Sequence, residues 1–189
     1  MAYQVEDLLG DVSQGTQTAS LTYEAYRNTA YKAYFFSHNA DDSLHMRFQL
    51  SHGWQLGTNL SLHLHWAPMV DPASSPEVVV FDGYYFFAKH DVVIPELAGW
   101  TAWTKVQAQV VTGDAFKPRL AEIAQIIPPS GAAVSDFVLV YLRRPGAADA
   151  ADTYKTSKGV GTNVANVMLL GVDLHLHKDR VGLLQANAL

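Results

Sequence analysis

The 189-residue sequence contains no cysteine, few basic residues and no long apolar run. Without cysteine there are no disulfide bonds or thiolate metal sites, so stability must come from packing or assembly. The 13 lysines and arginines are scattered among 18 acidic residues, which argues against a nucleic-acid partner. No apolar stretch approaches the ~18 residues of a membrane span, and residues 1–7 do not resemble a signal peptide. We therefore expect no membrane partner and folding in a cytoplasm.

What the sequence does contain is typical of a folded domain. Apolar residues make up 49% of the chain and charged residues 16%, which suits a substantial core. The length suits one domain rather than two. Residues 1–20 end in a polar stretch that cannot build a core. We expect an N-terminal arm over residues 1–20, with one helical turn at residues 6–9, and one domain over residues 21–189.

Two segments alternate strictly between apolar and polar side chains, which is the period of a half-buried strand. In the first, the apolar side is formed by Leu60, Leu62, Leu64 and Trp66, and the polar side by Ser61, His63 and His65. In the second, the apolar side is formed by Leu170, Val172, Leu174 and Leu176, and the polar side by Gly171, Asp173, His175 and His177. Each of the two strands thus presents the same kind of polar, histidine-bearing face.

The remaining pattern also indicates strands. Residues 31–37 and 44–50 predict a hairpin around a turn at 39–42, and residues 77–89 predict one long strand with a bulge at Gly83 or two short ones. Further strands are expected at 104–112, 136–143 and 165–177, with a long surface loop at 145–161. Residues 120–127 could by composition form a short helix, but their isoleucines and the flanking prolines favour a strand. Eight to ten strands without a convincing helix predict an all-β protein, a single-domain antiparallel β-sandwich of jelly-roll type.

The histidine pairs admit a metal-binding interpretation. Gly57, followed by five residues and His63-Leu64-His65, resembles the opening of the first cupin motif, in which two histidines on one strand bind a metal ion. Asp173, His175 or His177 completes the ligand set if the two strands are neighbours. The glutamate that a cupin has shortly after the second histidine is missing, however. We favour the plainer interpretation, an outward-facing polar face, and expect no metal or other cofactor.

Other functional interpretations rest on aromatic and basic residues. The aromatic residues have two interpretations. They form either a carbohydrate-binding platform or the core of the sandwich and a subunit interface. They are Trp54, Trp66, Trp100, Trp103 and the run at 84–87. Arg143 and Arg144 are either partners in inter-subunit ion pairs or a solvated strand end. No nucleophile elbow is present, so we expect no enzyme. The candidate interface residues are Trp54, His63, His65, Trp66, Arg143 and Arg144.

Three ordered blocks of sequence resemble a group of tailed-bacteriophage virion proteins. The blocks run from Ser51-His52 through Gly57-Thr58 to His63-Leu64-His65-Trp66, then Leu142-Arg143-Arg144 with Asp152-Thr153-Tyr154, then residues 172–177 with Asp179 and Gly182. The group carries proline, tyrosine and serine where this chain has Ser51, Leu176-His177 and Leu183.

The resemblance implies a non-enzymatic virion component with a β-sandwich body, assembled in the host cytoplasm. The favoured role is a capsid decoration or cement protein, a homotrimer on the major capsid protein. A tail or neck component, or a virion protein that binds host glycans, is the alternative. A cupin-like metal-binding protein is the third possibility.

Overall fold

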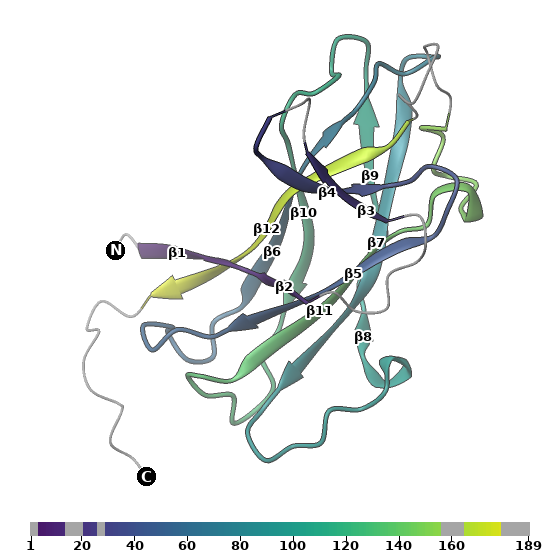
Figure 1. Cartoon of the computed structure of the whole chain (residues 1–189). Helices are drawn as coiled ribbons and strands as arrows, with labels where there is room; N and C mark the ends of the chain where they lie inside the picture. Colours follow the sequence, from purple (N-terminus) through teal and green to yellow (C-terminus); the bar gives the residue numbers. More distant parts are fainter. Residues whose placement is uncertain (1–3, 14–20, 26–28, 156–164, 179–189) are drawn as a thin grey trace.

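The structure, a computed structural model, describes residues 4–13, 21–25, 29–155 and 165–178 (Figure 1). These residues form twelve strands in two sheets and no α-helix. All strand pairs are antiparallel. The predicted all-β, jelly-roll-like antiparallel sandwich is therefore confirmed. Among the described residues, no helix is long and apolar enough to span a membrane.

Sheet A and sheet B, the names used below, each contain six strands. Sheet A has the order β10 (Arg119–Ile126), β6 (Leu60–Pro68), β12 (Val167–Lys178), β4 (Lys32–Phe36) and β3 (Thr22–Ala25), with β1 (Gln4–Leu9) also paired to β12. Sheet B has the order β2 (Asp11–Ser13), β5 (Asp42–Gln49), β11 (Phe137–Arg144), β7 (Glu77–Ala88) and β8 (Thr101–Ala102), with β9 (Val106–Val110) also paired to β7. Two short 3-10 turns, Leu97–Gly99 and Gly146–Ala148, lie in connections.

The core lies between the sheets because strand alternation sends every second side chain inward. On β6 the inward side chains are the predicted ones, and all are at most 1% exposed: Leu60, Leu62, Leu64 and Trp66. On β12 a bulge between Leu169 and Gly171 resets the alternation. Leu170, predicted to lie with the inward residues, instead packs beside a small second cluster around Phe35 and Met168.

Three local predictions are wrong. The expected helical turn at residues 6–9 is part of strand β1, which pairs with β12. The expected hairpin of 31–37 with 44–50 does not form, because β4 belongs to sheet A and β5 to sheet B, so their connection crosses the sandwich. The segment from Pro145 to Lys155, expected as surface loop, contains fully buried Asp152 and Tyr154. The rest of that predicted loop, residues 156–161, lies outside the described residues.

Several other strand predictions are confirmed. Residues 77–88 form one long strand, β7, rather than two, and residues 119–126 form strand β10. β7 pairs with β9 through its first half and with β11 through its second half. Figure 1 shows β1 running beside the last part of β12, so the chain's N-terminal segment joins the same sheet as its last described strand.

Candidate functional site: a histidine–carboxylate cluster

The histidines of both alternating segments meet on the outer face of sheet A. Because the leucines of β6 point into the core, His63 and His65 point outward. Strand β12 is the antiparallel neighbour of β6, with Asp173 opposite His63 and His175 opposite Ser61. The four residues His63, His65, Asp173 and His175 are called the histidine–carboxylate cluster below.

Asp173 is the centre of this cluster. Its Oδ2 lies 2.6 Å from His175 Nε2, and its Oδ1 lies 2.9 Å from His65 Nε2. The rings of His63 and His175 are 3.9 Å apart between centroids. One ligand atom from each of His63, Asp173 and His175 lies within 4.8 Å of the others. The side chains on neighbouring strands thus converge on one small volume.

Burial distinguishes the members of the cluster. Asp173 is 3% exposed, whereas His63 and His175 are half-buried and His65 is exposed. Burial lowers the pKa of His63, and the neighbouring His175 lowers it further, while Asp173 and Glu122 oppose this effect. The His63 imidazole is therefore held toward its neutral form, which is the form that binds metal ions.

Two carboxylates near the cluster were not identified from the sequence. Asp7 of β1 places Oδ1 3.0 Å from His175 Nε2, and Glu122 of β10 stands opposite His63 in the register. Asp7 was hidden because its segment reads as a helical turn in a polar arm. Glu122 carried a weak signal, since residues 120–127 were expected as a strand but with no indication of its neighbours.

The described residues do not form a cupin-like site. A cupin's ligands point into a barrel, but these histidines point out of a sandwich whose interior is filled by leucines. His177 is not part of the converging set; it lines a separate pocket of about 330 Å³ with Gln55, Thr58, Asn59 and Gln125.

Three of the six predicted interface residues are buried within the chain. Trp54 is 2% exposed, Trp66 1% and Arg144 0%, so none can contact another subunit in this fold. Trp54 Nε1 donates to Thr58 Oγ1 at 3.1 Å, and the Trp66 ring packs against Phe81 with centroids 5.5 Å apart. The two tryptophans are core residues. His63, His65 and the partly exposed Arg143 remain at the surface.

The second sequence block forms a buried clamp around Arg144. Its guanidinium donates to both carboxylate oxygens of Asp152, at 2.9 and 3.1 Å. It also donates to the carbonyls of Phe36, Ala165 and Tyr154, at 3.3, 2.8 and 2.8 Å. Arg144 therefore ties the segment after β11 to strand β4 and to the start of β12.

Tyr154 completes this clamp at the other end. Burial raises the pKa of Tyr154 to about 12, so the phenol stays protonated, and it donates to the Val70 carbonyl at 2.6 Å. Thr153 Oγ1 accepts a hydrogen bond from the Val78 N–H at 2.8 Å. The block that suggested an interface is thus a structural element that fixes a connection onto both sheets.

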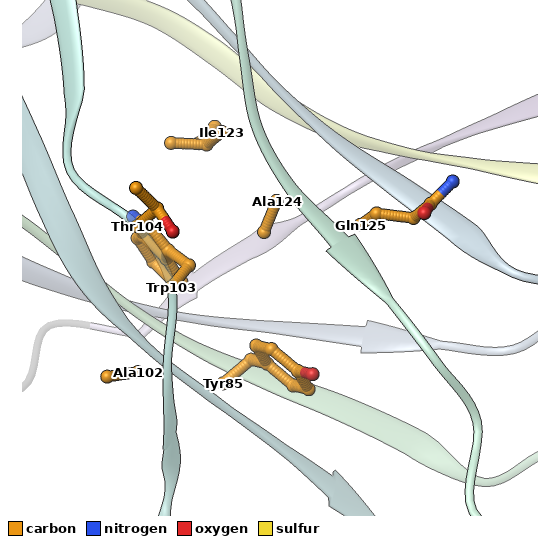
Figure 2. A pocket seen from close by; sticks show the side chains of 7 residues that line it. All are labelled: Tyr85, Ala102, Trp103, Thr104, Ile123, Ala124 and Gln125. Atoms are coloured by element: carbon orange, nitrogen blue, oxygen red, sulfur yellow. The ribbon is translucent and has the colours of Figure 1, made fainter.

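A pocket of about 350 Å³ lies at one edge of the sandwich (Figure 2). Trp103 and Thr104, between β8 and β9, face Ile123 and Ala124 of β10, while Gln125 points away from them. The β10 bulge between Glu122 and Ala124 turns both Ile123 and Ala124 toward the core. Among the described lining residues there is no carboxylate, imidazole or amine.

The outer face of sheet B carries half-buried aromatic rings. Tyr141 stands between His45 and Tyr84, with ring centroids 4.9 and 6.0 Å away. Trp100 stacks on Phe86 at 6.1 Å and meets His45 edge-on at 6.3 Å. These five residues are called the aromatic face below. Of the tryptophans predicted as a carbohydrate platform, Trp100 lies there, whereas Trp54 and Trp66 lie in the core.

Comparison with known proteins gave structural similarity alone. No family model matches the sequence, and no curated protein matches it. A family 16 carbohydrate-binding module is 12% identical with a TM-score of 0.38, covering 86% of this chain and 89% of that one. A module described for specific mannan recognition is 8% identical with a TM-score of 0.40, covering 93% and 99%.

A third solved structure is a tandem of family 22 modules from Paenibacillus barcinonensis. It is 12% identical with a TM-score of 0.40, and the match covers 88% of this chain and 46% of that two-module chain. The three proteins share with this chain a β-sandwich class. Similarities this low carry no argument about function.

Proposed function

We propose that this chain is a non-enzymatic structural component of a tailed-phage virion, a capsid decoration protein that binds the major capsid protein as a homotrimer. The proposal rests on the different positions of the three sequence blocks in the fold. The second block is a buried clamp that holds the fold together. Strands β6 and β12 of the first and third blocks pair to form one outward-facing, histidine-bearing surface.

The outer face of sheet A has the composition of a contact surface. Leu9 of β1 is 81% exposed and stands opposite Asp173, and Leu120 of β10 is 61% exposed and stands opposite His65. Apolar side chains thus flank the polar cluster on two sides. Exposed apolar groups beside polar ones are the composition of a protein-binding surface. We infer that this face contacts the capsid.

Binding to purified capsids tests the proposal. Heads assembled without this chain, from the major capsid protein encoded in the same genome, are mixed with the purified chain and separated on a density gradient. The chain is expected to sediment with the heads and to saturate at a fixed ratio to the capsid protein. Sedimentation with isolated tails instead would move the protein to the tail or neck. Binding to neither would refute the virion role.

Two matched variants locate the contact surface in the same assay. Leu120→Asp places a charge on the outer face of sheet A, and we expect at least about a tenfold loss of affinity for heads. Val93→Asp changes a residue that is 87% exposed in the connection between β7 and β8, so it serves as the control. Loss of binding in the control alone would place the contact on that connection instead.

Glycan binding by a virion protein is a second candidate, favoured by the aromatic face. Carbohydrates stack on aromatic rings, and Trp100, in the connection before β8, stacks on Phe86 of β7 to give two half-buried rings side by side. Trp100→Ala is expected to abolish retention on immobilised host glycans if this candidate is correct. A glycan array probed with the assembled oligomer that shows no bound sugar would exclude it.

A further inference from the structure

We propose that His63, Asp173 and His175 form a binding site for one divalent transition-metal ion of the Zn²⁺ type. The proposal does not depend on the virion role. It rests on the convergence of three ligand side chains from two paired strands and on the burial of the carboxylate among them.

The strand register brings the ligands together. His63 and Asp173 are directly opposite across the β6–β12 pair, and His175 is two residues from Asp173 on the same face. Zinc lies 2.0–2.2 Å from imidazole nitrogen and carboxylate oxygen, so ligand atoms around a tetrahedral ion are about 3.4 Å apart. The atoms here lie within 4.8 Å of one another, so movements of the ligand atoms by about 1 Å close the site.

The buried carboxylate is the second, independent observation. Asp173 is 3% exposed, yet its ion-pair partners in the described part of the chain are imidazoles, which carry charge only when protonated. Its Oδ1 accepts no well-aligned hydrogen bond, although His65 Nε2 is 2.9 Å away, and His63 Nδ1 is also buried without a hydrogen bond. A buried carboxylate without a compensating cation costs free energy. A bound metal ion supplies that positive charge.

The ligand types select the class of metal. Two imidazoles and one carboxylate suit zinc, iron, cobalt or nickel, whereas calcium and magnesium prefer oxygen-only ligand sets. Asp7 and His65 lie next to His175 and Asp173, at 3.0 and 2.9 Å. They are placed to orient the ligands or to supply a fourth one. The site opens outward, so water can take any position the protein leaves free.

Metal binding to the chelator-treated protein tests the proposal. Zn²⁺ is titrated by calorimetry, and Co²⁺ is added as a probe whose visible absorption reports its coordination. We expect one ion per chain and an absorption band typical of a four-coordinate site with nitrogen and oxygen ligands. The double variant His63→Ala/His175→Ala is expected to lose at least about 100-fold in affinity, since it removes two of three ligands.

His90→Ala is the matched control. Its imidazole is also near a buried carboxylate, with Nε2 4.0 Å from Asp136 Oδ1, but it does not belong to a converging set among the described residues. Its affinity for Zn²⁺ should equal that of the unchanged protein. Thermal unfolding of the metal-free variants confirms that each is folded. His175→Gln, which keeps a polar side chain of similar size, replaces the double variant if that one fails to fold.

Two results would overturn the proposal. One is a failure of the unchanged protein to bind Zn²⁺ or Co²⁺ at one ion per chain. The other is full binding by the folded double variant, or by folded His175→Gln, because the ion would then be held elsewhere.

Discussion

Arg143 and Arg144 are neighbours in the chain but have opposite environments. Arg144 is fully buried and donates to Asp152 and to three carbonyls. Arg143 is partly exposed and pairs with Asp82 at 2.6 and 2.7 Å and with Asp41 at 3.2 Å. The sequence predicts both as one basic strand end. Alternation along β11 separates them, because consecutive side chains face opposite sides of a strand.

Arg144→Met is expected to destabilise the protein by about 3–5 kcal/mol, because Asp152 would remain buried without its partner. Arg143→Met should cost less, about 2 kcal/mol, since Arg143 is itself 29% exposed and Asp41 can be solvated, although Asp82 loses its charged partner while buried. Urea unfolding of both variants, followed by fluorescence, measures the difference. Equal losses would contradict the role assigned to the clamp.

His38 makes the stability of the fold depend on pH. It is buried near Arg144 and Asp152, and burial lowers its pKa below the ordinary 6.5, an effect that Asn166 and Asp152 partly oppose and Arg144 reinforces. The unfolded chain therefore takes up a proton more readily than the folded one. Neutral His38 therefore makes its full contribution to the free energy of unfolding above pH 6.5. That contribution is lost as the pH falls through the lower pKa of the folded state.

We expect the urea midpoint to fall between pH 7.5 and pH 5, and His38→Gln to reduce that fall. His90→Gln, at a side chain that is 67% exposed, is the control for replacing a histidine at the surface. His45, whose pKa burial also lowers, accounts for part of the remaining slope. An identical pH profile for His38→Gln and the unchanged protein would show that His38 is not the group responsible.

At the scale of elements, β7 is the strand on which sheet B depends. It pairs with β8, β9 and β11, and Gly83 lies where the pairing passes from β9 to β11. Gly83 has a φ of 156°, and a Cβ there would lie 1.9 Å from the Tyr141 carbonyl oxygen and 2.7 Å from the Trp103 ring. Only glycine allows this close approach.

Gly83→Ala is therefore expected to prevent folding or to destabilise it by several kcal/mol, on the order of the largest single-residue effects. Gly171→Ala is the matched control, because a Cβ at Gly171 in β12 meets no atom within 4 Å. That change should stay within about 0.5 kcal/mol. Soluble yield and thermal unfolding compare the two. A folded, equally stable Gly83→Ala protein would show that the β7–β11 pairing is looser than described.

Strand existence was predictable at this scale, but strand pairing was not. The alternation of β6 identified its inward and outward sides before any neighbour was known. By contrast, β4 and β5 each have a strand pattern that fits either sheet, and the short connection between them allows a hairpin as readily as a crossing. Strand β1 was missed because its order depends on β12, more than 160 residues away. The local sequence of a strand does not predict a pairing partner so far along the chain.

At the scale of the whole molecule, the residues of the candidate site were predictable from the sequence, but their arrangement in space was not. The sequence predicted that each histidine strand carries the same kind of polar face, and it named every member of the histidine–carboxylate cluster, but it left open whether the two strands are neighbours. It did not predict the register that places Asp173 opposite His63, or the contribution of Asp7 from β1. It also counted Trp54, Trp66 and Arg144 as interface residues, because burial within one chain and burial between chains favour the same residue types.

The proposed virion role makes one demand on the whole protein, that it be present in finished particles in many copies. Quantitative mass spectrometry of gradient-purified virions, with the major capsid protein as internal reference, measures this directly. We predict a copy number in a fixed ratio to the capsid protein, as a decoration protein requires. Absence of the chain from particles, with all of it recovered in the soluble lysate, would contradict the account.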